Sequence, residues 1–132
     1  MFQALIAAGV RLSDLLVAEN RALAEFDLAT AAMLAPEKRR AVEAFAAAEA
    51  AVRKAGGRAE GSEREALAGL SARLADLAAA NRRMLERALA AQDAVVRTLA
   101  AAAVPKPALY GPVAPAGGHA VPPAPVGFAA NA

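Results

Sequence analysis

The stretch from Ser62 to Ala103 constrains the fold more than any other part of the sequence. Its larger apolar side chains recur every three or four residues, which places them on one face of an α-helix. Ser62 and Glu65 have the spacing of a capping box at a helix start, and Pro105 should end the helix because it has no backbone N–H. At about 1.5 Å per residue this helix would be roughly 60 Å long. Its apolar residues are Leu67, Leu70, Leu74, Leu77, Met84, Leu85, Leu89, Val95, Val96 and Leu99.

Two further helices are predicted before this stretch. Residues 2–34 keep one apolar face, and Pro36 should end that helix because the residue before a proline is disfavoured in the α region. Proline also suits the first turn of a helix, so a second, shorter helix is expected over residues 37–55. The glycines in residues 56–61 predict a loop. The expected core consists of Leu12, Leu16, Leu23, Phe26, Val42, Phe45, Leu67, Leu70, Leu74 and Leu77.

These elements predict an all-α protein, either a long antiparallel helical hairpin or a three-helix, coiled-coil-like bundle. The helical domain would span residues 1–104. Residues 105–132 are rich in Pro, Ala and Gly and offer little large apolar surface, so a disordered tail is expected there. Alanine dominates the 58% of hydrophobic residues, and aromatic residues make up only 4%, which indicates a thin core.

Composition also narrows the function. A net charge of +2 is too small for the basic stripe of a nucleic-acid-binding protein. The chain has no cysteine, so disulfide and thiolate chemistry are excluded. Arg11 and Asp14 interrupt the first apolar run, which does not read as a secretion signal, and a cytoplasmic location is expected. The prolines and glycines of residues 105–132 argue against stable membrane insertion.

Few side chains suggest catalysis. His119 has no carboxylate or cysteine at metal-ligand spacing, so we expect neither a metal nor another cofactor. Arg82, Arg83 and Arg87 form a basic cluster that could bind an anion, but Glu86 lies beside it and such runs are typical of solvated helix faces. No convergent set of charged residues can be assembled, and the chain is not expected to be an enzyme.

Glu19 and Asn81 occupy positions where the helical pattern calls for an apolar residue. A polar side chain at such a position can fix the register between helices at some cost in stability. It can also contact a partner protein. Both interpretations are open from the sequence.

Several residues of the predicted helices, together with residues after them, form an ordered motif. The order is Leu15-Leu16-x-x-Glu19-x-x-Ala22-Leu23-x-x-x-Asp27, Lys38 after a turn, Asn81-x-x-x-Leu85-x-x-x-Leu89 with Val95 and Leu99, then Tyr110-Gly111 and Gly117. This combination resembles the FlgN-type flagellar export chaperones, and it covers nearly all of the predicted helical region. The resemblance implies a small helical cytoplasmic protein that binds flagellar hook-associated proteins, the hook-filament junction proteins, and delivers them to the type III export gate.

The resemblance also implies roles for particular residues. In that family the late part of the last long helix takes up a terminal helical segment of the exported protein. A tyrosine after the helix is implicated in docking to the gate, a role that falls here on Tyr110 with Gly111. The residues expected to bind the exported protein are Asn81, Leu85, Leu89, Gln92, Val95, Val96 and Leu99.

The apolar pattern leads to a compatible expectation by a separate route. A middle helix of residues 37–55 would be about 28 Å long and could cover only about half of the last helix. An uncovered apolar face indicates a partner site or self-association, including a homodimer of the free chain. The alternatives to a chaperone are a generic coiled-coil interaction module and a phasin-like protein that coats granule surfaces. The apolar face lacks the bulky Trp and Phe residues typical of interfacial helices.

Overall fold

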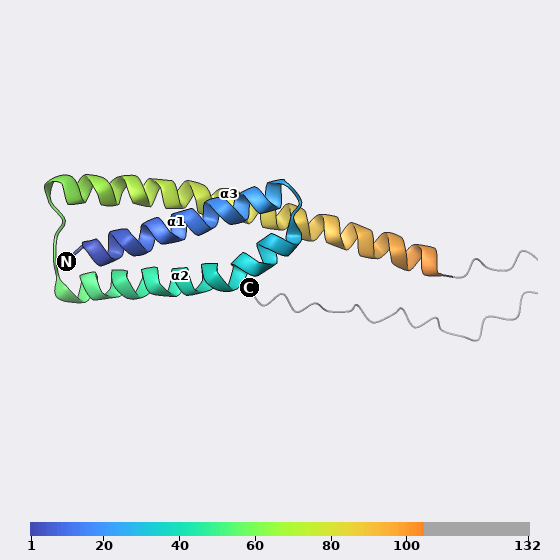
Figure 1. The fold of residues 1–132 in the computed structure, drawn as a ribbon, viewed down its shortest axis with the longest axis horizontal. Helices are drawn as coiled ribbons and strands as arrows, with labels where there is room; N and C mark the ends of the chain where they lie inside the picture. The colour runs from blue at the N-terminus through green and yellow to red at the C-terminus, as the bar shows by residue number, and fades with distance from the viewer. Residues whose placement is uncertain (105–132) are drawn as a thin grey trace, which may run out of the picture.

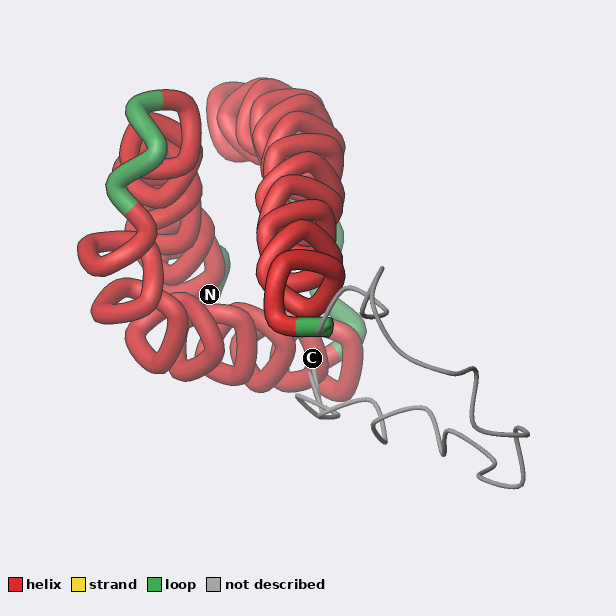
Figure 2. The backbone as a smooth tube through the Cα atoms, turned by 90° about the vertical axis from the view of Figure 1, so that its right-hand side faces the viewer, coloured by secondary structure: helices red, strands yellow, loops and turns green. Residues whose placement is uncertain are grey.

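The computed structural model describes residues 1–104, which form three α-helices joined by short connections (Figure 1). The helices are α1 (Gln3–Ala24), α2 (Leu28–Ala55) and α3 (Gly61–Ala103). Figure 2 shows only helices and loops in this range, which confirms the all-α prediction for the described residues. The expected disordered tail falls on residues 105–132, which lie outside the described residues.

α1 is the central helix of the three. It packs against both α2 and α3, whereas no Cα atom of α2 comes within 8 Å of one in α3. Figure 1 shows α1 between its two neighbours, with consecutive helices running in opposite directions. None of the helices in residues 1–104 is both long and apolar enough to cross a membrane.

The first helix is shorter than the sequence pattern predicts. The prediction of one helix over residues 2–34 is wrong, because α1 ends at Ala24 and the chain reverses through Glu25, Phe26 and Asp27. The Asp27 N–H donates to the Ala22 carbonyl over 2.8 Å, and the Phe26 N–H donates to the Leu23 carbonyl over 3.2 Å. These two bonds form a Schellman motif, which satisfies carbonyls left open at the helix end.

Asp27 then begins the next helix. Its side chain accepts a hydrogen bond from the Thr30 backbone N–H over 3.1 Å, so it is the N-cap of α2. The prediction that Pro36 begins a second helix over residues 37–55 is wrong, because α2 begins at Leu28 and Pro36 lies within it. Proline removes one i to i−4 hydrogen bond and crowds the preceding turn, so a bend is expected there. The first turns of α2 run at an angle to the rest in Figure 1.

α3 follows the predicted pattern closely. It ends at Ala103, and Val104 is extended before Pro105, as predicted. Its start differs, since the helix begins at Gly61 and no side chain caps its N-terminus. The predicted capping box of Ser62 and Glu65 is therefore not formed. The predicted loop is confirmed, and Gly56 adopts a left-handed conformation with φ of 66° where α2 ends.

The core consists of two clusters along α1. The first joins the buried Leu12, Leu16 and Ala41 to partly buried leucines of α3, and the second joins Ala22, Leu23 and Ala31 to Met84, Leu85 and Ala88. α2 contributes alanines to both clusters, which lets its backbone approach α1 closely. Burial of each leucine stabilises the fold by about 1.5–3 kcal/mol, so the leucines of α1 supply much of a thin core.

The predicted core is confirmed in part. Leu12, Leu16 and Leu23 are buried. Phe26 and Val42 were predicted in the core, but both are exposed. Phe26 misses the core because it lies in the turn after α1, and Val42 lies at the margin of the α1–α2 contact. The other five predicted residues are partly buried: Phe45, Leu67, Leu70, Leu74 and Leu77.

Candidate functional site

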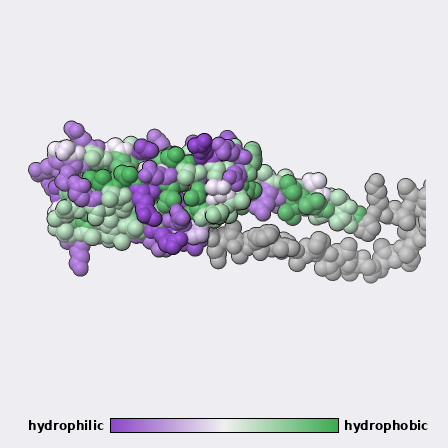
Figure 3. Space-filling view, viewed as in Figure 1, coloured by the Kyte–Doolittle hydropathy of each residue, from purple (hydrophilic) through white to green (hydrophobic). Residues whose placement is uncertain are grey.

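The last part of α3 extends beyond the rest of the molecule. We call residues 89–103 the projecting segment, and the helices up to residue 88 the body. Every residue of the projecting segment is exposed, including Leu89, Val96 at 51% and Leu99 at 64%. Figure 1 shows this segment running past the α1–α2 turn, and Figure 3 shows hydrophobic residues gathered on it.

The apolar face of the projecting segment continues the face that packs on α1. In the body, Leu85 and its neighbours pack against the end of α1 at Leu23. From Leu85 the same spacing of three and four residues continues along α3 through Leu89, Gln92, Val96 and Leu99. The cover stops only because α1 ends at Ala24. The projecting segment therefore has an apolar face that no helix covers, whereas α1 covers the same face of α3 in the body.

Local interactions keep the projecting segment helical. It is rich in alanine, which has the highest helix propensity. Asp93 and Arg97 form an ion pair one turn apart at 2.9 Å, and the Thr98 hydroxyl donates to the Ala94 carbonyl over 2.8 Å. An exposed pair of this kind contributes only about 0.3–0.5 kcal/mol. The segment is thus presented as a helix without tertiary packing.

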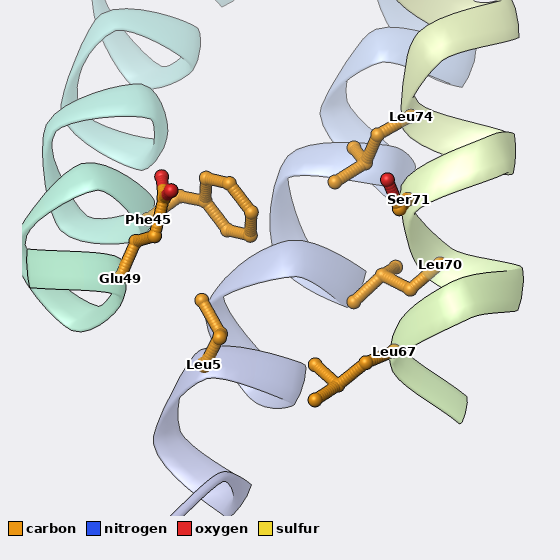
Figure 4. A pocket seen from close by; sticks show the side chains of 7 residues that line it. All are labelled: Leu5, Phe45, Glu49, Leu67, Leu70, Ser71 and Leu74. Carbon is orange, nitrogen blue, oxygen red and sulfur yellow. The ribbon is translucent and has the colours of Figure 1, made fainter. Parts of the chain in front are cut away.

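A groove lies between α2 and α3, with α1 beneath it. At one end it forms a hollow of about 320 Å³, shown in Figure 4, where Phe45 and Glu49 of α2 face Leu67, Leu70 and Leu74 of α3. Gly9 of α1 permits this arrangement, because a Cβ atom there would lie 2.4 Å from a methyl carbon of Leu70.

A second hollow of about 340 Å³ lies further along the same two helices and reaches the projecting segment. Leu12 and Leu16 of α1 line it together with Val42 of α2, and Leu85 and Leu89 of α3 lead out of it. The second hollow therefore connects the apolar residues of the body with the apolar face of the projecting segment.

A buried polar network joins all three helices beside the second hollow, which Lys38 and Asn81 also line. Glu19, which is 2% exposed, binds the Lys38 ammonium with Nζ to Oε2 at 2.8 Å. The Asn81 amide nitrogen donates to Glu19 Oε2 over 2.8 Å and to Asn20 Oδ1 over 2.9 Å, and Lys38 donates to Asn81 Oδ1 over 3.3 Å. Asn20 in turn donates to the Leu77 carbonyl over 3.3 Å.

This network supports the register interpretation of Glu19 and Asn81. Both side chains are buried and hydrogen-bonded to one another, and a shift of α3 along α1 would separate them. A buried polar group without partners is costly, so the network favours one alignment of the helices. In the sequence, only the resemblance to the chaperones pointed to Lys38. In the structure, Lys38 is the residue of α2 that takes part in the network.

The α1–α2 turn carries an unusual residue. Phe26 has φ of 55°, in the left-handed region where glycine is common and a bulky side chain is rare. This conformation costs about 1–2 kcal/mol for a residue with a Cβ atom. The residue is nevertheless 75% exposed. Beside it, two hydrogen bonds from Thr30 lower the pKa of Asp27, which stabilises the ionised form of the α2 N-cap.

The predicted site residues fall into three groups. Leu89, Gln92, Val95, Val96 and Leu99 lie exposed on the projecting segment, and Leu85 lies partly buried where that segment leaves the body. Asn81 is set apart from them, since its side chain is buried in the polar network. Tyr110 and Gly111 lie outside the described residues, and so does His119, at which no site is expected. The sequence pattern missed Phe26 as an exposed residue, although Asp27 and Thr30 already have the spacing of an N-cap.

The basic cluster separates into paired and unpaired arginines. Arg82 binds Glu86 at 3.2 Å, whereas Arg83 and Arg87 take part in no ion pair within residues 1–104. The same part of the chain contains no group of three or more acidic or histidine side chains that could hold a metal ion.

No protein-family model matches the chain, and neither a curated protein nor a solved structure matches it.

Proposed function

We propose that this protein is a cytoplasmic export chaperone that binds flagellar hook-associated proteins through the projecting segment of α3 and delivers them to the type III export gate. One observation carries the proposal: an apolar face that packs on α1 within the body continues, uncovered, over residues 89–103. In this proposal the three helices act as a coiled-coil-like bundle that holds α3 in position.

The geometry suits a partner that is itself a helix. A helix that lies on Leu89, Val96 and Leu99 would extend the line of α1 and would face the same stripe that α1 faces in the body. Helices bind such faces through side chains at every third or fourth residue. The projecting segment has 15 positions from residue 89 to residue 103 and is about 22 Å long, which matches a partner helix of roughly four turns.

The resemblance to export chaperones gives this binding mode a biological context. Five of the seven residues implied to bind the exported protein lie on the projecting segment: Leu89, Gln92, Val95, Val96 and Leu99. Tyr110 and Gly111 are proposed to dock to the export gate. The polar network that holds Asn81 would act indirectly, by fixing α3 on the other two helices.

The proposal is tested by placing charges on the projecting face. The double variant Leu89→Asp, Val96→Asp should keep nearly all of its helix content, because both side chains are exposed. Its affinity for a hook-filament junction protein should fall at least a hundredfold, since a buried unpaired carboxylate costs several kcal/mol. Circular dichroism and isothermal titration calorimetry measure the two properties.

Ala90→Asp, Ala101→Asp is the matched control, because both alanines are exposed on the opposite side of the same segment. It should bind the junction protein as the unmodified chain does. Unfolding of the Leu89, Val96 variant would place these residues in the protein's own core and contradict the proposal. Co-sedimentation of the unmodified chain with polyester granules, without junction-protein binding, would support the phasin-like alternative instead.

A further inference from the structure

Phe26 is costly to the fold in two ways that packing does not offset. Its backbone has φ of 55°, where Gly is the common residue at the end of a helix. The residue is 75% exposed, so an aromatic residue is left largely in water. Strained backbone positions concentrate at binding and catalytic sites. The residue therefore points to a contact that residues 1–104 do not themselves provide.

The surroundings of Phe26 have the form of a binding hollow. Leu23 from the end of α1, Phe26 from the α1–α2 turn, and Met84 and Ala88 from α3 line a space of about 220 Å³, and Arg87 lines it as well. The hollow lies where α1 ends and the projecting segment begins. A helix bound to that segment would bring its inner end to this place.

Arg87, the charged residue that lines the hollow, favours an acidic partner. Arg21 and Glu25 at the end of α1 pair with each other at 3.3 Å, and the Asp27 side chain is hydrogen-bonded to Thr30. Arg83 and Arg87, one turn apart on α3, have no such partner within residues 1–104. Two like charges one turn apart also destabilise a helix slightly, and a carboxylate placed between them would relieve that repulsion.

We propose that the hollow at Phe26 receives the acidic end of an amphipathic partner helix whose apolar face lies on the projecting segment. Phe26, with Met84 and Ala88, packs against the last apolar side chain of that helix. Arg87, assisted by Arg83, binds a carboxylate of its terminal turn. This inference rests on the proposed function for the position of the partner helix. It adds that the end of the partner helix is acidic and that this end lies at the Phe26 hollow.

The test uses the full chain and two synthetic 18-residue helical peptides. Both have leucines at spacings of three and four residues, and they differ only in two Glu or two Lys residues in each terminal turn, so the result is independent of the direction in which they bind. Fluorescence anisotropy should show the acidic peptide binding at least fivefold tighter. Arg87→Glu should reverse that order, and higher salt should reduce the difference.

Phe26→Gly separates the strain from the binding. It should raise the midpoint of thermal unfolding by a few degrees while weakening the acidic peptide at least threefold, since stability and binding are opposed at a strained site. Met33→Gln is the matched control because Met33 is 76% exposed, and Arg73→Glu is the control for Arg87. Neither control should change the preference between the peptides.

The outcomes distinguish this inference from the proposed function. Equal affinity for the two peptides, no binding of either, or an unchanged preference in Arg87→Glu would overturn the inference. So would full affinity in Phe26→Gly. If Leu89→Asp, Val96→Asp abolishes peptide binding while the Phe26 and Arg87 variants leave it intact, only the inference fails. If the Leu89, Val96 variant binds both peptides normally, the proposed function fails.

Discussion

Two parts of α3 have the same kind of sequence but different surroundings. From Leu67 to Ala88 the apolar stripe is partly buried against α1, and from Leu89 to Ala103 the same stripe is exposed. The cause of the difference lies in α1, which ends at Ala24 and therefore does not cover the later residues of α3. Helical periodicity thus specifies which face of a helix is apolar but not what covers it. The uncovered part, residues 89–103, is the proposed partner-binding segment.

Truncating a leucine in each region should give the largest contrast. Leu16→Ala removes a buried side chain from the first core cluster and should lower the free energy of unfolding by about 3 kcal/mol. Leu99→Ala removes an exposed side chain and should change it by less than about 0.5 kcal/mol. Urea unfolding followed by circular dichroism measures both.

A large loss of stability in Leu99→Ala would contradict this contrast. It would mean that the projecting segment is covered in solution, as in a homodimer formed through it. Stability that depends on protein concentration would identify that case, because dimer dissociation is then coupled to unfolding.

Glu19→Ala should have the next largest effect, about 2 kcal/mol of lost stability in the same experiment. The change leaves the Lys38 ammonium and the Asn81 amide without their shared acceptor, and loss of one partner from a buried ion pair costs about 3–5 kcal/mol. The smaller value is expected because the Lys38 side chain is 22% exposed and can reach water.

Glu86→Ala is the control for Glu19, since it breaks an exposed ion pair with Arg82 on the surface of α3. Its effect should be within about 0.5 kcal/mol. Equal effects of the two substitutions would mean that the network does not hold α3 on α1. The contrast between body and projecting segment would then depend on the apolar clusters alone.

Local sequence signals were sufficient for much of the fold. The long periodicity and Pro105 locate α3 and its end. Local signals failed at the α1–α2 turn. Phe26 occupies a left-handed position there that Gly usually takes, and Pro36 suggested a break later in the chain. A proline can be accommodated inside a long helix when tertiary packing repays the lost hydrogen bond, and here α2 packs along α1 on both sides of Pro36.

The candidate site was only partly accessible from the sequence. Polar residues at apolar positions identified Glu19 and Asn81, because a helical pattern makes such exceptions visible. Their partner Lys38 could not be found in this way, since a lysine on α2 fits a solvated face equally well. The hollow at Phe26 was missed because it depends on where α1 ends, and that depends on hydrogen bonds of the turn.

The smallest effect on affinity is expected for Tyr110→Ala, which tests whether partner binding is confined to α3. Tyr110 follows the end of α3 at Ala103 in the sequence and is proposed to dock to the export gate, whereas the junction protein is proposed to bind the projecting segment. The substitution should therefore change the affinity for the junction protein by no more than a few tenths of a kcal/mol, as for a position with no shared contacts. Binding to the gate and secretion of the junction protein should both fall. Pull-downs of the variant with each partner separately measure the two interactions. Equal loss of both would mean that the junction-protein site extends past α3. Unchanged gate binding would contradict the docking role of Tyr110.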